Sequence, residues 1–518
     1  MTTALDSGFV LLNPQDSVAV CLRRFEAGVV LDVGSGEVTF REPIAAGHKV
    51  AVRRIERGEL IYKFGYSIGV ATDHIEAGQH VHSHNLETEH QIDLDAISTE
   101  IPASRQLDKE YFFDGYLRPD GRVGTRNYIA VISNVNCSAS VARMVAKQFG
   151  DLPEYENIDG VISFRHEGGC AMSWEGSRHK MLNDVLGGMA KHPNVGGYLL
   201  VGLGCEQATL SHLADSKRLH RIEHPSAGAE TATTEVPILS IQSSGGTRQT
   251  VEAGVEVVRE MLPKVDAARR SRVPASELML ALECGGSDGY SGITANPALG
   301  VAADMLVASG GTAILSETAE IFGAEHLLTK RARSREVAEQ LLAKLQWWRE
   351  YCEKYGEELD SNPSVGNKAG GLTTITEKSL GAVAKAGSSA LEAVYDYAHQ
   401  VDKKGFVVMD TPGFDPASVT GMVAGGANLV AFTTGRGSCF GFKPTPSYKI
   451  ASNSQLYKRL PEDMDFNAGT IVEGRSVEEV GQEMFEDLLE VASGRPTCSE
   501  KLDLGDEEFV PWLVGPLL

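Results

Sequence analysis

The chain is poor in basic residues and lacks long apolar runs, and both absences exclude classes of protein. It has 48 Lys and Arg against 70 Asp and Glu in 518 residues, which gives a formal net charge of −22. Nucleic acids and anionic membrane surfaces are bound through clustered Lys and Arg, so neither is expected as a partner. No apolar run approaches the roughly 20 residues that cross a bilayer, and Met1–Asp6 holds no basic residue and predicts neither a signal nor a transit peptide. We expect a soluble protein of the cytoplasm that binds a small molecule.

Several common sequence signatures are also missing. The 8 cysteines are scattered and form no Cys-x-x-Cys pair, so reduced thiols are expected rather than a disulfide framework. No Gly-Lys dipeptide occurs, which excludes a Walker A loop, and the segment Gly202–Gln207 lacks the third glycine of a dinucleotide fingerprint. Kinases and nicotinamide-dependent dehydrogenases are therefore excluded.

The length predicts about three domains, at roughly 150 residues each. Residues 8–90 predict a small all-β domain, because a short unit recurs there. In each unit a glycine stands midway between two apolar residues, three positions from each, which is typical of a tight turn that leads into a half-buried strand. These units are Ile44–Val50, Ile55–Ile61 and Ile75–Val81. Residues 91–110 are polar and acidic, which is typical of a linker.

From residue 111 onward the sequence predicts a large α/β region with parallel sheets. Short apolar, β-rich runs alternate with helical stretches, as expected for strands that are covered on both faces. The runs are Tyr128–Ile132, Gly160–Phe164, Tyr198–Val201, Leu278–Leu282, Thr312–Leu315, Phe406–Met409 and Leu429–Phe432. Helices are predicted at Glu252–Leu262, Arg335–Tyr355 and Val477–Ala492, the last with Ser476 and Glu479 as a capping box. The basic segment Lys264–Arg272 divides the region into a first α/β domain, 111–265, and a second, 266–518.

Reactive side chains follow these runs, at the strand ends where open α/β sheets bind their ligands. They are Asn136, Cys137, His166, Cys170, Cys205, Glu206, Cys284, Ser287, Asp288, Glu317, Asp410 and Arg436. Because reactive side chains follow all seven predicted strands, we expect an active site at this edge of the sheets. For the thiols two interpretations stay open: Cys137, Cys170, Cys205 and Cys284 are small buried hydrophobes, or together they ligate iron, although their wide spacing makes an iron–sulfur cluster the less favoured one.

Three alternating histidines mark the end of the β domain. His80, His82 and His84 would face the same side of a strand, with successive alpha carbons about 7 Å apart. Such a pattern is typical of a shared divalent metal, of an anion site, or of a solvated strand end, and the sequence leaves all three open. The remaining ligands of a metal would come from carboxylates, thiols or substrate, and an open site of that kind suits catalysis.

Two glycine-rich turns each hold one cation. Asn362–Gly371 carries Lys368 and Thr433–Gly437 carries Arg436, and in such turns backbone N–H groups and a fixed charge converge on a carboxylate. The alternatives are an ordinary loop lysine and an internal ion pair. A Gly-x-Ser-x-Gly match around Ser287, with His326 or His399 as partner, is a weak indication of a serine hydrolase.

The sequence resembles the altronate/galactarate dehydratase family of sugar-acid dehydratases over nearly its whole length. The resemblance rests on separate motifs in the family's order: Gly47–Ala51, Asp120–Asn127, Gly202–Glu206, Cys284–Asp288, Ser291–Pro297, Gly366–Gly371 and Phe466–Gly469. Gly78–Asn85 and Glu320–Leu328 are similar to the altronate branch. The chain departs from the family at Glu167–Cys170, at Cys439–Phe440 and at Trp512–Pro516, which points to a different hexonate or a related acid.

The resemblance implies a small N-terminal SAF-type β domain before a large α/β region. It also implies a dehydration that gives a 2-keto-3-deoxy sugar acid and depends on Fe²⁺ or another divalent metal such as Mn²⁺ or Mg²⁺. The alternative is a sugar-acid-binding protein without activity, and a homo-oligomer is left open.

We assign the candidate residues on these grounds. The candidate catalytic residues are His48 or His166 as general base, with Lys368 and Arg436 as clamps for the substrate's carboxylate or hydroxyl groups. The candidate substrate-binding residues are Arg126, Asn127, Ser287, Asp288, Asn296 and Asn367. The candidate metal ligands are His80, His82 and His84.

Overall fold

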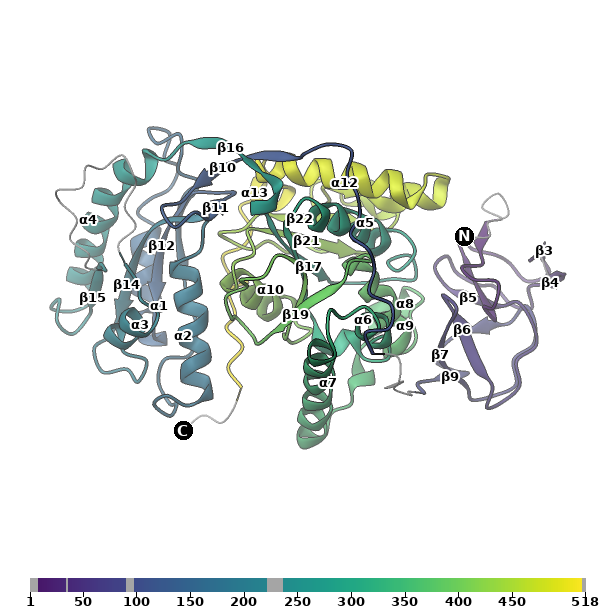
Figure 1. Cartoon of the computed structure of the whole chain (residues 1–518). Coiled ribbons are helices and arrows are strands. Elements are labelled where there is room, and N and C mark those ends of the chain that lie inside the picture. Colours follow the sequence, from purple (N-terminus) through teal and green to yellow (C-terminus); the bar gives the residue numbers. More distant parts are fainter. Residues whose placement is uncertain (1–7, 34–35, 90–96, 221–235, 515–518) are drawn as a thin grey trace.

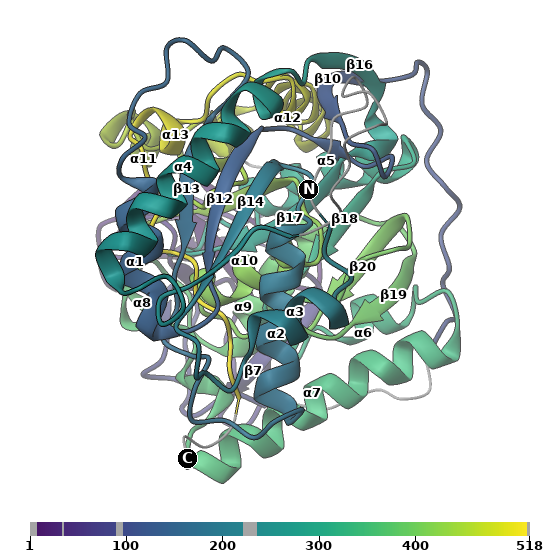
Figure 2. The same ribbon diagram turned by 90° about the vertical axis from the view of Figure 1, so that its left-hand side faces the viewer.

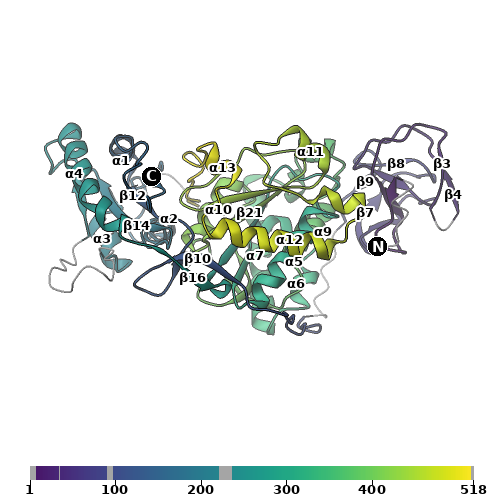
Figure 3. The ribbon, with the colours of Figure 1, turned by 90° about the horizontal axis from the view of Figure 1, so that it is seen from above.

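Three parts of the chain lie in a row in the computed structural model, which describes residues 8–33, 36–89, 97–220 and 236–514 (Figure 1). The N-terminal β domain lies at one end, a small α/β domain at the other, and a large α/β domain between them. Seen from above, the long helix α12 (Val477–Ala492) runs along the large domain between the two outer parts (Figure 3).

The β domain is built from short antiparallel strands and tight turns. They form sheets in the orders β1-β2-β5-β8, β3-β4 and β6-β7-β9. The strands are β1 (Phe9–Val10), β2 (Val18–Cys21), β3 (Val30–Asp32), β4 (Glu37–Thr39), β5 (Lys49–Ala51), β6 (Leu60–Lys63), β7 (Tyr66–Ala71), β8 (His80–Val81) and β9 (Leu86–Glu87). The expectation of an all-β domain at the N-terminus is confirmed.

The repeated unit of the sequence is the turn that starts a strand. Gly47, Gly58 and Gly78 have φ of 82°, 82° and 85°, a region that glycine adopts without a steric penalty. A fourth copy, which the sequence pattern did not single out, has Gly28 at φ 85° and leads into β3. Its apolar residue is Phe25, whose aromatic side chain hides the likeness to the three isoleucine units.

A narrow antiparallel ribbon connects the two α/β domains. β10 (Phe112–Leu117) pairs with β11 (Val123–Gly124) and with β16 (Arg270–Pro274), so the chain enters and leaves the small α/β domain through neighbouring strands. Before the ribbon, Ser98 and Glu100 donate backbone hydrogen bonds to Thr329 and Lys330 of the large domain. This end of the expected linker is therefore tied down, while residues 91–96 lie outside the described residues.

The small α/β domain has a four-stranded parallel sheet in the order β13-β12-β14-β15. Its strands are β12 (Tyr128–Ser133), β13 (Gly160–Phe164), β14 (Val195–Gly202) and β15 (Ile238–Ser240). Ile129 and Val131 pack against α1 (Asn136–Ala146) and α4 (Thr247–Asp266). Ala130 and Ile132 face α2 (Ser177–Ala190) and α3 (Leu210–Ser216), so both faces are covered (Figure 2).

The large α/β domain has a seven-stranded sheet in the order β19-β20-β18-β17-β21-β22-β23, with every pair parallel. Its strands are β17 (Met279–Cys284), β18 (Thr312–Leu315), β19 (Leu391–Tyr395), β20 (Gly405–Met409), β21 (Leu429–Thr434), β22 (Ser447–Ala451) and β23 (Phe466–Asn467). Its further helices are α5 (Ala295–Ala308), α6 (His326–Thr329), α7 (Arg335–Tyr355), α8 (Val365–Ala369), α9 (Ile375–Val383), α10 (Asp415–Ala424), α11 (Ser454–Arg459) and α13 (Cys498–Lys501). The predicted α/β class with parallel sheets is confirmed. In the described part of the chain, no helix is both long and apolar enough to span a bilayer.

The β domain and the large domain share one hydrophobic core. Val18, Ile61 and Val81 of the β domain belong to the same buried cluster as Ile375 and Leu380 of the α9 helix. Burial of such side chains is worth roughly 1.5–3 kcal/mol each, so this contact fixes the β domain against the carboxyl ends of the central strands.

Candidate active site

The β domain meets the large domain through backbone atoms that approach each other closely. A methyl group built on Gly371 or Gly289 would collide with the carbonyl oxygen of Gly47. The Gly289 N–H also donates to the Gly370 carbonyl at 2.8 Å. Only glycine at these positions allows the turn before His48 to lie directly on the loop that follows α8.

A buried ion triad holds this contact. Lys49 Nζ lies 2.9 Å from Glu377 Oε2, and Lys63 Nζ lies 2.8 Å from Glu377 Oε1. Lys49 also donates to the Gly371 carbonyl at 2.7 Å. Burial lowers the pKa of Lys49 to about 8, although Glu377 opposes the shift. For Glu377, burial raises the pKa, but the two lysines outweigh burial and bring the pKa far below its usual value. The triad is thus charged, and each member depends on its partners.

Four histidines gather at this junction. Three come from the end of the β domain, and His48 joins them from the neighbouring turn. The ring centroids of His48 lie 5.1 Å from His80 and 5.2 Å from His82, and those of His80 and His84 are 5.5 Å apart. Nδ1 of His48 lies 2.9 Å from Nε2 of His80. The predicted histidine strand is only partly a strand, because β8 ends at Val81 and a turn follows.

The large domain supplies carbonyl oxygens to the same cluster. His82 Nε2 lies 2.9 Å from the Lys368 carbonyl, and His48 Nε2 lies 3.3 Å from the Ala369 carbonyl. Burial lowers the pKa of His80 to about 3 and that of His82 to about 4, and it also lowers the pKa of His48. Neutral imidazole is the form that ligates metals and accepts protons.

Lys368 of α8 and Arg436 of the turn after β21 lie on neighbouring loops next to the histidines. The Asn367 side chain donates to the Ser287 carbonyl at 2.8 Å and caps α8 together with Ser364, which fixes the loop. Arg436 follows β21, its N–H donates to the Gly286 carbonyl at 2.8 Å, and its side chain is exposed. A methyl group on Gly370 would lie 3.3 Å from Arg436 Cδ, so the guanidinium arm runs beside the loop that carries the Lys368 carbonyl.

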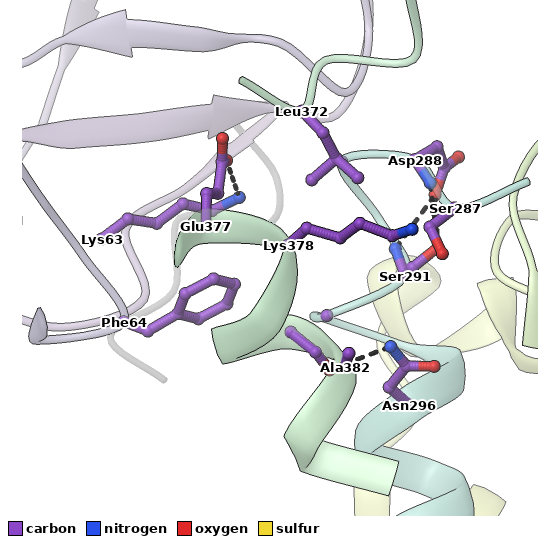
Figure 4. Close-up of a pocket in the computed structure, with 13 residues that line it drawn as sticks. Lys63, Phe64, Ser287, Asp288, Ser291, Asn296, Leu372, Glu377, Lys378 and Ala382 are labelled. Carbon is purple, nitrogen blue, oxygen red and sulfur yellow. Dashed lines mark hydrogen bonds and ion pairs between the residues drawn. The ribbon is translucent and has the colours of Figure 1, made fainter. Parts of the chain in front are cut away.

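Three other candidates hold the loops in place. Asp288 is buried and accepts hydrogen bonds from Ser291 and Ser452, at 3.0 and 2.9 Å. Asn296 donates to the Gly381 carbonyl at 2.9 Å. With Ser287, which is 3% exposed, they line a cavity with room for about one water molecule between Lys63, Phe64 and Lys378 (Figure 4).

The sequence analysis missed a buried cluster of charges beside this cavity. Its members come from the ends of β17 and β18 and from helices that pack on them: Glu283, Cys284, Glu317, Glu320, Lys378, Lys385 and Asp415. Lys385 lies 2.6 Å from Glu317, and Lys378 lies 2.6 Å from Glu320. Cys284 and Glu317 were visible as strand-end residues, but nothing in the sequence pattern marked the two lysines.

This cluster contains oxygen atoms without partners. Ligand atoms of Glu283, Glu317 and Asp415 all lie within 4.8 Å of one another, and so do those of Cys284, Glu317 and Glu320. Among the described residues, Oε1 of Glu283 and Oε1 of Glu317 accept no hydrogen bond although they are buried. Burial and the neighbouring carboxylates raise the pKa of Asp415 to about 7. Orphaned carboxylate oxygens of this kind fit a divalent cation.

Three sequence-predicted residues, Arg126, Asn127 and His166, belong to the small α/β domain. Figure 1 shows this domain at the opposite end of the molecule from the β domain that carries the histidines. Arg126 and Asn127 precede β12 at its amino end, where Arg126 bonds Glu500 at 2.6 and 2.8 Å and Asn127 donates to the Val265 carbonyl at 3.0 Å. His166 follows β13 and contacts the Ser133 carbonyl at 3.0 Å, and burial lowers its pKa to about 4. The structure does not bring these side chains to the junction. Their hydrogen bonds are to residues that pack around the small α/β domain.

The predicted set of four cysteines is not assembled. Cys284 is buried in β17 of the large sheet, whereas Cys137, Cys170 and Cys205 are exposed in the small α/β domain. The four thiols therefore cannot act as one iron-binding group.

Comparison with known proteins gives the family. The chain matches the altronate/galactarate dehydratase SAF domain over residues 7–89, the second domain of D-galactarate dehydratase/altronate hydrolase over 115–266, and the C-terminal domain of D-galactarate/altronate dehydratase over 275–517. It is 35% identical to an altronate dehydratase of Bacillus subtilis over 96% of this chain and 97% of that protein. The chain belongs to the D-galactarate/altronate dehydratase family. Altronate dehydratase of Escherichia coli is 34% identical over the same shares, and galactarate dehydratase of E. coli is 35% identical over 94% of this chain and 93% of that protein.

Membership makes the chain an enzyme of a hydro-lyase family, and it identifies the N-terminal β domain as a SAF domain. The SAF domain supplies the four histidines, and the C-terminal domain supplies the α8 loop and Arg436. Two of the departures from the family pattern touch each other, since a methyl group on Gly168 would lie 2.6 Å from Leu513 Cδ1. These two changes belong to one packing contact in the small α/β domain, away from the histidines.

Proposed function

We propose that this chain removes water from a six-carbon sugar acid, an altronate-type aldonate or a galactarate-type aldarate, and releases a 2-keto-3-deoxy sugar acid. Family membership supports the reaction class. The main structural support for the site is that the SAF histidines contact the α8 loop, next to the exposed Arg436. This junction lies at the carboxyl ends of parallel strands, where open α/β sheets bind their ligands.

The chemistry needs positive charge near the substrate carboxylate. The proton on the carbon next to a carboxylate is weakly acidic, so its removal requires stabilisation of the enediolate that develops. Arg436 suits this task because a planar guanidinium binds a carboxylate through two parallel hydrogen bonds, and Lys368 of the neighbouring α8 adds a second cation. Their placement beside the histidines supports the assignment of both as clamps.

His48 is our candidate for the general base. Its imidazole is half-buried, and burial lowers its pKa, so it is neutral and able to accept a proton at neutral pH. The contact of its Nδ1 with His80 fixes the ring orientation. His166 lacks this support, since its ring is held by the Ser133 carbonyl and the Gly168 N–H of the other α/β domain.

The junction and the buried carboxylate cluster beside it offer two candidate places for a divalent metal. His80 and His82 have ring centroids 5.2 Å apart, and burial lowers the pKa of both, so each offers a neutral imidazole nitrogen. His80, His82 and His84 would hold an ion such as Fe²⁺ once their ring nitrogens, which do not all lie within 4.8 Å of one another, move closer together. The orphaned oxygens of Glu283 and Glu317 offer a second, oxygen-rich place that suits Mn²⁺ or Mg²⁺. When bound, the ion would act as a Lewis acid toward the substrate carboxylate.

A substrate panel tests the proposal. Purified protein with reductant and ferrous iron is incubated with altronate, galactarate and other hexonates, and 2-keto-3-deoxy acids are assayed. We expect product from one of these acids. Binding of a sugar acid without turnover would favour the rival function, a non-catalytic sugar-acid-binding protein, and absence of both would contradict the proposal.

A further inference from the structure

The small α/β domain gathers three exposed thiols at one edge of its sheet. Cys170 follows β13, Cys137 follows β12 as the second residue of α1, and Cys205 follows β14. These strands are neighbours in the order β13-β12-β14 and all run parallel. Their carboxyl ends therefore lie side by side, and each contributes one cysteine to the same edge.

Hydrogen bonds tie the three cysteine segments together. The N–H of Asn136, next to Cys137, donates to the Gly168 carbonyl at 2.9 Å. The N–H of Ala208 donates to the Gly169 carbonyl, next to Cys170, at 2.9 Å. The Asn134 side chain donates to Glu206, next to Cys205, at 3.0 Å. Each cysteine is thus one residue away from a bond that joins its segment to another cysteine's segment.

The backbone at this edge is shaped for close approach. Gly169 has φ of 101°, and a methyl group there would lie 2.5 Å from the Asn134 carbonyl oxygen and 2.6 Å from Val135 Cα. A larger residue would push the Cys170 segment away from the start of α1. The glycine is required for the three segments to meet.

Exposure separates these thiols from the core cysteines. Cys21 and Cys284 are buried, as small hydrophobic residues usually are, whereas Cys137, Cys170 and Cys205 are exposed. Packing does not account for three exposed thiols at adjacent strand ends.

We propose that Cys137, Cys170 and Cys205 hold an iron–sulfur cluster of the [4Fe–4S] type, with one iron not bound by cysteine. The three sulfurs do not all lie within 4.8 Å of one another, so they are not gathered around a single ion. In a cluster each thiolate binds a different iron, and the thiolates stand farther apart than ligands that share one metal. The cluster would be separate from the histidine junction, and it does not depend on the proposed function.

Iron and sulfide analysis tests the site on the full chain. The protein is purified without oxygen, treated with equal amounts of ferrous and ferric iron and with sulfide, and freed of excess reagent. We expect about four iron and about four acid-labile sulfide atoms per chain, with the brown absorbance of a [4Fe–4S] cluster. Cys137→Ser, Cys170→Ser and Cys205→Ser should each lose most of the sulfide and colour. Cys352→Ser, a partly exposed cysteine of α7, is the matched control and should keep both.

A second measurement needs no substitution. Alkylation followed by mass spectrometry should find Cys137, Cys170 and Cys205 protected in the loaded protein and modified after chelator treatment, with Cys352 modified equally in both. A loaded wild type without sulfide, or equal alkylation of the three thiols before and after chelation, would overturn the proposal. A colourless protein that still forms 2-keto-3-deoxy acids would overturn the cluster alone, and a coloured protein without product would overturn the proposed function alone.

Discussion

Lys49 Nζ of the SAF domain and Glu377 Oε2 of the C-terminal domain lie 2.9 Å apart, and neither side chain is exposed. Glu377 also binds Lys63, so one carboxylate neutralises two buried cations from the other domain. Lys49 is the residue after His48. The ion pair that docks the domains therefore also positions the candidate base.

Glu377→Gln should be strongly destabilising. The substitution leaves two lysines buried without a counter-charge, which costs about 3–5 kcal/mol of unfolding free energy. Denaturant unfolding measures the loss. Glu339→Gln, which removes an exposed pair with Arg335, is the control and should change the unfolding free energy by less than about 1 kcal/mol. Equal effects of the two substitutions would show that the triad does not hold the interface.

His192 should make the protein less stable in acid. Its ring is buried, its Nε2 contacts the Ala427 carbonyl at 2.9 Å, and burial together with Arg122 and Arg118 lowers its pKa to about 3. An unfolded histidine has a pKa of about 6.5, so between these values the unfolded chain binds the extra proton and stability falls as pH falls.

His192→Asn removes this dependence and provides its test. From about pH 7.5 to about pH 5, the wild type should lose up to about 2 kcal/mol more unfolding free energy than the variant loses. The exposed His399 gives the control variant, His399→Asn, which should follow the wild type. Parallel stability curves for wild type and His192→Asn would rule out a neutral buried histidine.

Metal content should distinguish the two candidate metal sites. If the histidines hold the ion, His80→Ala should lower by tenfold or more the iron bound in excess of acid-labile sulfide, because a neutral imidazole ligand is lost. Glu317→Gln should then leave the iron content near that of the wild type. The reverse pattern, measured by elemental analysis of the purified variants, would move the metal to the buried carboxylates.

Arg436→Ala should weaken substrate binding as well as turnover. Loss of a bidentate contact to the carboxylate is expected to raise KM and to lower kcat/KM by about 10²-fold, and Arg436→Lys should recover only part of it. Arg335→Ala, an exposed arginine at the start of α7, serves as the control. Steady-state kinetics of Arg436→Ala with an unchanged KM would remove Arg436 from the binding site.

Local patterns predicted the elements well. α7 and α12 begin and end at the predicted residues, and the Ser476–Glu479 capping box is present. A cap depends on neighbours three residues apart, so it can be read from a short window. Seven of the eleven parallel strands were recognisable as continuous apolar runs. β15, β19, β22 and β23 were missed, because β15 and β23 are very short and a charged residue, Glu392 or Lys449, interrupts β19 and β22.

Contacts between distant segments could not be predicted in this way. His48 meets His80 from 32 residues away, and Lys385 meets Glu317 from 68 residues away. Arg126 lies in a motif that carries the family resemblance, yet its partner is Glu500, 374 residues away, and its bonds tie chain segments together. A motif marks a position as important without saying whether it binds substrate or holds the fold.

Proton NMR of the reaction in D₂O tests the central claim, that dehydration occurs at the junction with His48 as base. The wild type should consume the proton on the carbon next to the carboxylate and release a 2-keto-3-deoxy acid that carries solvent deuterium at its new methylene. His48→Ala should slow this by roughly 10²-fold or more with little change in KM. His48→Ala turnover at the wild-type rate, or a wild type that forms no deuterated product from any hexonate, would contradict the account.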